Sequence, residues 1–304
     1  MNVEKTRTYI QRSRSSPLEI KLRKDHLASY LDNAFPLVIP HLRRLKSLAV
    51  YADDLPDVLT HFRCQVPLLE ELDVRLSHND YPFLDSTLFD GDLSSLRKLT
   101  LSGVTTHLLW NNTTNLQVFH LGSPEHDVTQ LLDFFESAPL LHTVKLMDSI
   151  TDSSDAPPQR IVPLPHLNTL TIDTDPYSVL LNHLCIPTGA SLILGFEFSG
   201  NESPLLDCLP EDSANLKNLT HITTINLLFD SVEKFVRLSG PSGSLHVDAY
   251  WIVRDTDSYT MDRRILRSLS PSILSTTQRL AISMYRHPNL TENKNPQFSE
   301  PSPP

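Results

Sequence analysis

The stretch Leu59-Thr-His-Phe-Arg-Cys-Gln-Val-Pro-Leu-Leu-Glu-Glu-Leu-Asp-Val74 has a counterpart 72 residues further along the chain, at Leu131–Leu146. Both segments read Leu-x-x-Phe-x-x-x-x-Pro-Leu-Leu-x-x-[Leu/Val]-x-[Leu/Val]. The apolar alternation at the end predicts a short strand with one buried face. Apolar residues with helical spacing over 55–62 predict a helix before this strand, and Pro67 ends the helix. The sequence therefore contains a repeated unit of helix, turn and strand.

The strand part of this unit, Leu-x-x-Leu-x-Leu or a close variant, recurs at steps of 20 to 29 residues. The middle residues of the triplets are Leu48, Leu72, Leu99, Phe119, Val144, Leu170, Phe196 and Ile225. The number of triplets alone is close to chance, so the regular spacing is the evidence. A period in this range is typical of leucine-rich repeats, in which units stack because one unit cannot bury its apolar face alone.

These observations predict an α/β leucine-rich repeat solenoid, or horseshoe, over residues 18–285. Outer helices are expected at 129–137 and 176–185, where apolar residues again have helical spacing. The repeats are irregular and degenerate. The Asn or Cys expected after each strand is replaced by Ser77, Val104, Pro124, Ser149 and Asp175.

The C-terminal part differs in pattern from the repeats. Strand-like runs occur at 222–229, 235–238, 245–253 and 278–284. We therefore expect residues 222–285 to form an atypical, more β-rich closing section. The segment 286–304 is rich in Pro, Asn, Ser and Glu and is expected to be disordered. Residues 1–17 form a separate, basic N-terminal segment.

The distribution of charge argues against nucleic acid as a partner. The chain of 304 residues has a net charge of −10, whereas residues 1–24 carry seven basic and two acidic side chains, or +5. The remainder is therefore near −15, and a phosphate backbone needs a positive surface. No apolar run has the length of a membrane span, and no secretion signal precedes the repeats. We expect an intracellular protein, cytoplasmic or nuclear, without a membrane partner.

No catalytic or metal-binding pattern stands out. The three cysteines are scattered, no His-Glu-x-x-His or phosphate-binding glycine motif is present, and Gly240-Pro-Ser-Gly243 is better explained as a hairpin turn. We therefore expect no enzyme activity, no catalytic residues, no cofactor and no metal. A repeat scaffold of this kind is typical of a protein that binds other proteins.

Several segments resemble a large fungal family of F-box proteins with leucine-rich repeats, especially that of mushroom-forming fungi. They are Pro67-Leu-Leu-Glu-Glu-Leu-Asp-Val74, Leu93-Ser-Ser-Leu-Arg-Lys-Leu-Thr-Leu101, Gln130-Leu-Leu-Asp-Phe-Phe-Glu-Ser-Ala-Pro-Leu-Leu141, Leu181-Asn-His-Leu-Cys-Ile-Pro-Thr-Gly-Ala-Ser-Leu192 and Phe235-Val-Arg-Leu-Ser-Gly-Pro-Ser-Gly243. The resemblance covers roughly residues 8–285. In that family, an F-box binds the adaptor of a cullin-RING ubiquitin ligase and the repeats select the protein to be ubiquitinated.

The resemblance implies a non-enzymatic module like the substrate-recognition part of such a ligase, with a protein partner of unknown identity. No F-box precedes the first strand-like segment, Leu18–Leu22, so the adaptor is expected as a partner only if an F-box exists upstream. Two alternatives remain. The chain is an acidic scaffold that binds basic proteins, or it is a truncated gene product with no ligase role.

Strand residues that alternate with the buried ones are expected to form the concave, partner-binding face. Their chemistry is mixed, with small polar groups and both signs of charge but no aromatic cluster. The candidate residues are Glu71, Asp73, Arg75, Lys98, Thr100, Ser102, His120, Lys145, Met147, Thr171 and Asp173.

Overall fold

The fold is described from a computed structural model. It describes residues 3–23, 35–52, 64–77, 83–84, 88–91, 93–106, 113–122, 126–147, 150, 160–173, 177–198, 215–217, 219, 223–229, 233–240, 246–253 and 278–284. The helix predicted at 55–62 and the tail predicted at 286–304 lie outside these residues. The domain boundaries drawn from the sequence stay predictions.

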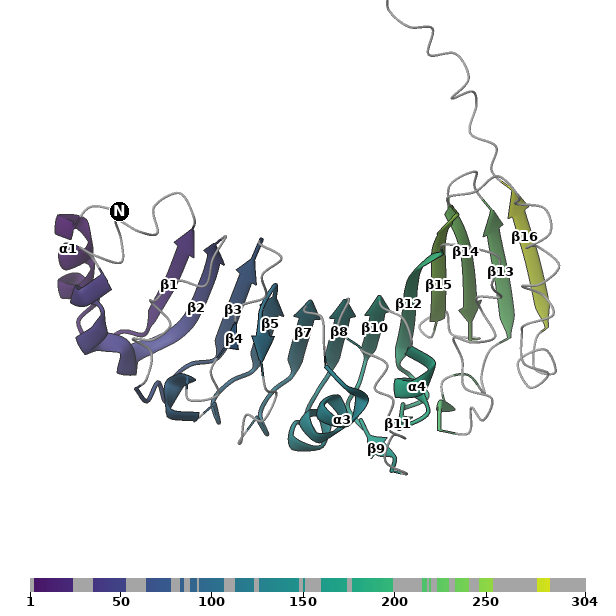
Figure 1. Cartoon of the computed structure of the whole chain (residues 1–304), viewed down its shortest axis with the longest axis horizontal. Coiled ribbons are helices and arrows are strands. Elements are labelled where there is room, and N and C mark those ends of the chain that lie inside the picture. Colours follow the sequence, from purple (N-terminus) through teal and green to yellow (C-terminus); the bar gives the residue numbers. More distant parts are fainter. Residues whose placement is uncertain are drawn as a thin grey trace, which may run out of the picture.

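Eight parallel strands, beginning with the edge strand β1, form the first part of a twelve-stranded sheet (Figure 1). Their order in the sheet is also their order in the chain, because each strand pairs with the next one of the series. The strands are β1 (Leu18–Arg23), β2 (Leu45–Ala52), β3 (Glu71–Leu76), β5 (Lys98–Ser102), β7 (Val118–Gly122), β8 (Thr143–Met147), β10 (Thr169–Asp173) and β12 (Ser191–Phe198).

Four C-terminal strands continue the sheet in a different order. They are β13 (Thr224–Phe229), β14 (Glu233–Ser239), β15 (His246–Val253) and β16 (Arg279–Met284), close to the predicted ranges. β12 pairs in parallel with β15, β15 and β14 are antiparallel, as are β14 and β13, and β16 lies parallel to β13. The simple sequential order of the sheet therefore ends at β12.

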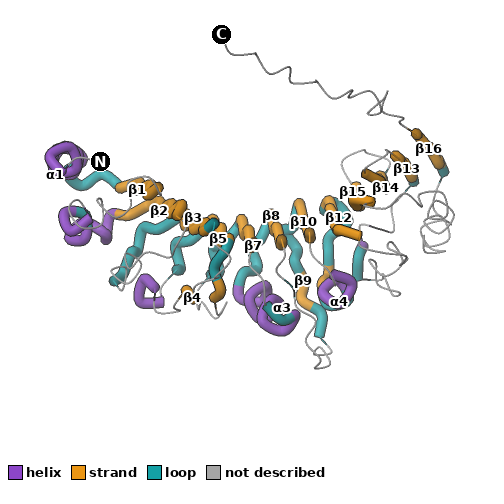
Figure 2. The backbone as a smooth tube through the Cα atoms, turned by 45° about the horizontal axis from the view of Figure 1, so that its top comes forward, coloured by secondary structure: helices purple, strands orange, loops and turns teal. Residues whose placement is uncertain are grey.

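The connecting segments lie on one side of the strands (Figure 2). Helix α1 (Val3–Ser13) precedes β1, and the short 3-10 helices η2 (Phe35–Leu37) and η3 (Ile39–Arg44) follow it. The later connections contain β4 (Phe83–Leu84), η5 (Leu88–Gly91), β6 (Thr105–Thr106), α3 (Val128–Ser137), β9 (Val162–Pro163), α4 (Tyr177–Leu181) and β11 (Leu184–Cys185). The helix predicted at 129–137 is confirmed as α3, whereas the one predicted at 176–185 is reduced to the five residues of α4.

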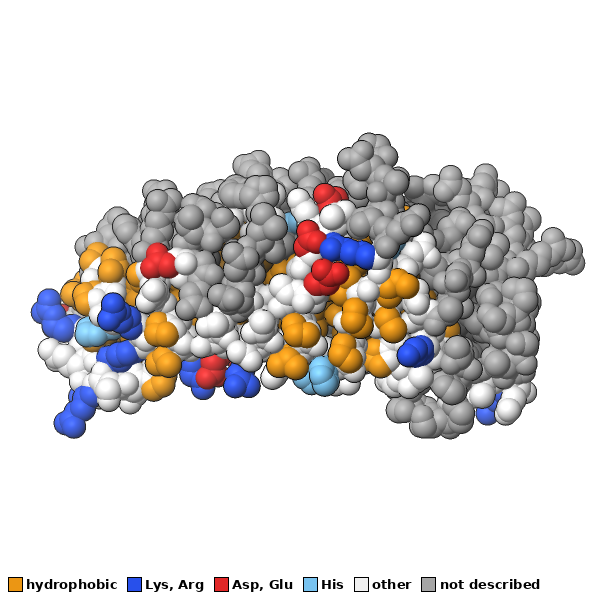
Figure 3. All heavy atoms as spheres, turned by 90° about the horizontal axis from the view of Figure 1, so that it is seen from below, with side chains coloured by type: hydrophobic (Ala, Val, Ile, Leu, Met, Phe, Trp, Pro, Cys, Tyr) orange, Lys and Arg blue, Asp and Glu red, His pale blue; other side chains and the backbone are white. Residues whose placement is uncertain are grey.

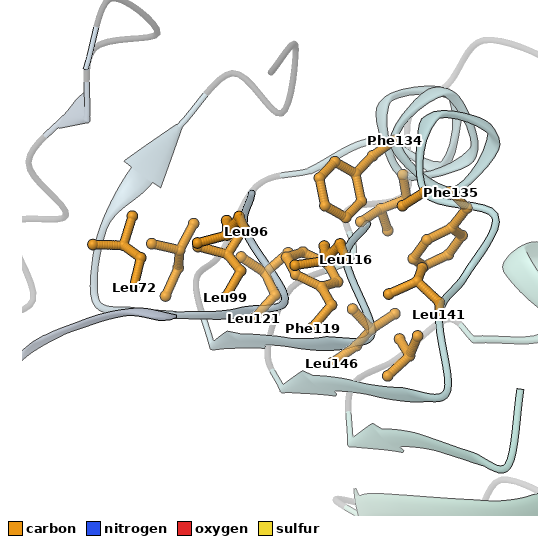
Figure 4. Close-up of a cluster of buried hydrophobic side chains, with 14 of the residues drawn as sticks. Leu72, Leu96, Leu99, Leu116, Phe119, Leu121, Phe134, Phe135, Leu141 and Leu146 are labelled. Carbon is orange, nitrogen blue, oxygen red and sulfur yellow. The ribbon is translucent and has the colours of Figure 1, made fainter. Parts of the chain in front are cut away.

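Helix α3 forms where its sequence provides both a cap and an apolar face. The Asp127 carboxylate accepts a hydrogen bond from the Gln130 backbone N–H at 2.7 Å, which satisfies one of the free donors of the first turn. Leu131, Phe134 and Phe135 are buried against the sheet. Phe119 of β7 meets Phe134 with ring centroids 4.4 Å apart (Figure 4). Aromatic packing thus joins α3 to the middle of the sheet.

The core lies between the sheet and these connections (Figure 4). Strand residues in register stack across it, as Leu72 does on Leu99, Leu99 on Phe119, and Phe119 on Val144. All four are 0% exposed, as expected for the inward positions of a strand. The turns before β3, β5, β7, β8 and β10 each add another buried leucine. These residues are Leu69, Leu96, Leu116, Leu141 and Leu167.

The predicted leucine-rich repeat horseshoe is wrong. The chain forms a mostly parallel central sheet of eight strands with few helices, an α/β fold whose strand order changes direction after β12, as the order also does in doubly wound sheets. Its connections do not repeat one structure: short strands, a 3-10 segment, and helices of 10 and 5 residues follow one another. The apolar triplet determines a strand and its buried face but not the connection, so its spacing predicted the wrong architecture.

Candidate protein-binding face

The face of the sheet opposite the core, here called the open face, carries every residue proposed from the sequence as partner-binding. Strand register aligns them in three rows that run across the sheet. The first row contains Glu71 and Lys98, the second Asp73, Thr100, His120, Lys145 and Thr171, and the third Arg75, Ser102, Met147 and Asp173. Their placement on one face is as expected, although whether they bind a partner is a separate question.

The two strands before β3 extend these rows with residues that the sequence interpretation did not single out. Lys21 of β1 pairs in register with Ala49 of β2, and Ala49 with Asp73. In the same way, Arg23 is followed by Tyr51 and Tyr51 by Arg75. The alternation in β1 and β2 marks these positions as outward, but only the register shows that they continue the same rows.

Tyr51, Asp73 and Arg75 form a hydrogen-bonded cluster on the open face. The Tyr51 hydroxyl donates to Asp73 Oδ2 at 2.7 Å, and Arg75 Nε donates to Asp73 Oδ1 at 2.8 Å. Lys21 Nζ lies 4.8 Å from the centroid of the Tyr51 ring, within the range of a cation–π contact. The hydrogen bond to Asp73, followed by burial, raises the pKa of Tyr51, and the pKa of Arg75 is also raised, first by its own hydrogen bond to Asp73. The negative charge of the Asp73 carboxylate is therefore already balanced by Arg75.

A hollow of about 390 Å³ lies beside this cluster, over β1, β2 and β3. Its floor includes Ser47 and Ala49, whose small side chains leave space between the longer ones of the neighbouring strands. Glu19, Lys21 and Tyr51 line it on one side. Glu71, Asp73 and Lys98 line it on the other. Its lining is polar and carries both charges, which suits a polar protein segment better than an apolar ligand.

The open face is not acidic, although the chain as a whole is. Across the described rows of β1 to β10, the basic residues are Lys21, Arg23, Arg75, Lys98 and Lys145, and the acidic ones are Glu19, Glu71, Asp73 and Asp173. Five basic and four acidic side chains give a local balance of +1, against −10 for the chain. The excess of acidic residues therefore lies elsewhere.

Thr100 is a buried hydroxyl in the middle of the second row. Its side chain is 5% exposed, and its Oγ1 has no hydrogen-bond partner in the part of the chain that the structure describes. Asp73 and His120 are its register neighbours on the two adjacent strands. An unsatisfied buried hydroxyl costs about 1–3 kcal/mol of stability, so Thr100 is not explained by packing.

Replacing this hydroxyl with a methyl group is expected to stabilise the protein. We predict that Thr100→Val raises the free energy of unfolding by about 1 kcal/mol, because the unsatisfied donor is removed at nearly constant shape. Thr106→Val is the matched control, since the equally buried Thr106 hydroxyl donates to the Leu84 carbonyl at 3.4 Å and its loss should destabilise. Urea unfolding of both variants measures the effect. Destabilisation by Thr100→Val would contradict the absence of a partner.

His120 is half-buried among positive charges. Burial lowers its pKa below the ordinary value of 6.5, and Lys145, Lys98 and Arg75 lower the pKa further, while Asp73 acts in the opposite direction. The folded protein therefore binds this proton less readily than the unfolded chain does. The stability that neutral His120 contributes is complete above pH 6.5 and is lost progressively as the pH falls through the folded-state pKa.

Removing one of these charges should be visible in the titration of His120. In Lys145→Gln we expect the pKa of His120 to rise toward 6.5, because a positive neighbour no longer opposes protonation. The chemical shifts of the imidazole protons against pH measure it, and His120→Gln assigns the signals. Lys5→Gln on α1 makes the same change of charge away from this face and should leave the pKa of His120 unchanged. Equal titration curves for Lys145→Gln and the unmodified protein would refute the electrostatic cause.

Other site classes find no support among the described residues. No group of three or more His, Cys, Asp or Glu side chains is placed there to hold a metal ion. Cys64 and Cys185 are free and half-buried, and burial raises the pKa of the Cys64 thiol, which lowers its reactivity. Within the described ranges, no helix combines the length and the apolar character required to cross a membrane.

Comparisons with protein-family models, with curated proteins and with solved structures found no match to this chain. The open face is therefore interpreted from its own geometry.

Proposed function

We propose that this chain is a non-enzymatic protein-interaction module that binds a protein partner on its open face. The observation that carries the proposal is the asymmetry of the sheet: the connecting segments lie on one side of it (Figure 2) and bury the core there. On the other side, strand register aligns rows of side chains, most of them half-buried or exposed. Rows of this kind mix hydrogen-bonding groups, both charges and the exposed Met147, as protein interfaces do.

The opposite side is less suited to this role. Seen from below, hydrophobic side chains lie next to a small group of acidic and basic ones (Figure 3). Arg160 forms ion pairs with Asp133 and Glu136 of α3 and so satisfies charges within the chain itself. These ion pairs hold the segment immediately before β9 against α3, which is a structural use of the charges.

The resemblance to fungal F-box proteins supports a more specific form of the proposal. In that form, the partner bound by the open face is a protein selected for ubiquitination, and other chains perform the ubiquitin transfer. The absence of a catalytic pattern from the sequence agrees with a binding role.

Capture of the partner by two variants tests the proposal. Thr143 and Thr169 are register neighbours on the open face, so Thr143→Trp/Thr169→Trp places two large, uncharged side chains across the rows. Ile161→Trp, at a 52% exposed position next to β9, is the control on the opposite side. From extracts of cells that naturally express the chain, we expect the unmodified protein and the control to capture the same protein.

The open-face double variant should capture less than about a tenth of the partner that the unmodified protein captures, since blocking the centre of an interface costs more than about 1.4 kcal/mol of binding free energy. Repetition with the identified partner in purified form gives the affinities. Equal capture by all three proteins would refute binding at the open face. Strongly salt-sensitive capture of basic proteins would favour the acidic-scaffold alternative instead.

A further inference from the structure

Two lysines on the middle of the open face have no acidic partner among the residues that the structure describes. Lys98 of β5 and Lys145 of β8 form no ion pair or hydrogen bond with any residue that the structure describes, although Glu71 is the register neighbour of Lys98. Arg75 differs, because the Asp73 carboxylate holds it through two hydrogen bonds. The uncompensated charge of this region is therefore positive.

These lysines lie on either side of His120. Lys145 is the direct register neighbour of His120, and Lys98 lies one row away on the strand before it. β5 and β8 are separated only by β7, so the two lysine-bearing strands are about 10 Å apart. Alternate side chains of an extended peptide are about 7 Å apart, a distance that two flexible lysine stems can bridge.

The buried Thr100 hydroxyl is an independent sign of an incoming group. It lies in the same row as His120 and Lys145, and no described residue provides it with an acceptor. A carboxylate is acceptor-only and can receive bonds from a hydroxyl and an ammonium together. The free protein thus bears the cost of a polar group that an acidic ligand would satisfy.

We propose that the open face over β5, β7 and β8 binds an acidic peptide segment of the protein partner, whose carboxylates pair with Lys98 and Lys145 around Thr100 and His120. This inference rests on the proposed function and names the chemistry of the partner. A basic segment would leave both lysines opposed by like charge. A nucleic acid is disfavoured because its phosphates need a broad positive surface, whereas Glu71 and Asp73 lie within the same rows.

The site also makes binding dependent on pH. Bound carboxylates favour protonated His120, so the affinity for an acidic segment should rise as the pH falls toward the pKa of His120. The charged groups that face His120 are Lys98 on β5, Lys145 on β8, and Asp73 and Arg75 on β3. Histidine is the side chain whose ordinary pKa lies near neutral pH, so the charge of His120 is the one that changes in this range.

The test uses four probes on the full chain, each carrying a fluorescent label. The probes are an octapeptide of alternating glutamate and glycine, its lysine and glutamine counterparts, and a thymidine oligonucleotide of the same charge as the acidic peptide. We expect the acidic peptide to bind best. Lys98→Gln and Lys145→Gln should each weaken the binding of this peptide about three- to tenfold. Glu71→Gln should strengthen it, because a charge of the same sign as the peptide is removed. Lys5→Gln should bind as the unmodified protein does.

Two further readouts separate binding at this site from general charge attraction. Thr100→Val should weaken the binding of the acidic peptide although it stabilises the fold. A saturating concentration of the peptide should raise the pKa of His120, as measured by the chemical shifts of the imidazole protons. The inference would be overturned if the acidic peptide did not bind, or if Lys98→Gln and Lys145→Gln bound it as tightly as the unmodified protein does. Tighter binding of the basic peptide or of the oligonucleotide would also overturn it. If the open-face double variant still loses its partner in that case, the proposed function stands without this chemistry.

Discussion

Replacing Phe119 by alanine is expected to lower the free energy of unfolding by roughly 3–5 kcal/mol. Phe119 is 0% exposed, lies between Leu99 and Val144 in the core row, and contacts the rings of Phe134 and Phe135 at centroid distances of 4.4 and 6.5 Å. Its removal leaves a cavity between the sheet and α3, where the rings of Phe119, Phe134 and Phe135 pack against one another (Figure 4). Typical domains have a total stability of about 5–15 kcal/mol, so much of the native state would be lost.

Urea unfolding followed by circular dichroism measures this change. Phe119→Leu keeps most of the buried volume and should cost much less, about 1–2 kcal/mol. Val118→Ala alters the neighbouring, half-buried residue on the open face and should cost less still. A loss below about 1 kcal/mol for Phe119→Ala would show that α3 is not packed on β7.

Gly103→Ala should also destabilise strongly, by roughly 2–4 kcal/mol, because two independent features require glycine at this position. Gly103 has φ +71°, in the left-handed region that residues with a Cβ disfavour. A Cβ there would also overlap the backbone oxygen of Leu76 at the end of β3. The Gly103 N–H donates to the Gly122 carbonyl at 2.8 Å, so a shift of the turn would disturb β7 as well.

Gly189→Ala is the matched control for this prediction. A Cβ at Gly189 meets no atom within 4 Å, so the same substitution should change stability by less than about 1 kcal/mol. Thermal unfolding of the two variants gives the comparison. Equal melting temperatures would contradict the close approach of Gly103 to β3.

The local elements could be predicted from the sequence because each follows from a short pattern. The alternation in Leu72-Asp-Val74 specifies both a strand and its buried face, and the apolar spacing from Leu131 to Phe135 specifies α3. The architecture could not be predicted in this way. The pairing of β12 with β15 joins residues far apart in the chain, and no periodic pattern encodes it. The connections differ in length and structure even where the strands are alike.

The candidate face was partly predictable for the same reason. Outward positions follow from the alternation, so residues such as His120 and Lys145 could be assigned to one face. The hydrogen bond between Tyr51 and Asp73 depends on the register of β2 with β3, which the apolar pattern does not specify. The burial of Thr100 likewise depends on the residues that the register places beside it on β3 and β7, which the composition does not specify.

Site-specific photo-cross-linking tests most directly whether the open face binds the partner. A photoreactive amino acid placed at Met147, which is 38% exposed on the open face, reports contacts there, and one at Ile161, which is 52% exposed on the opposite side, reports contacts with the connecting segments. Binding at the open face predicts a partner adduct at position 147 and none at 161. An adduct at 161 without one at 147 would contradict it.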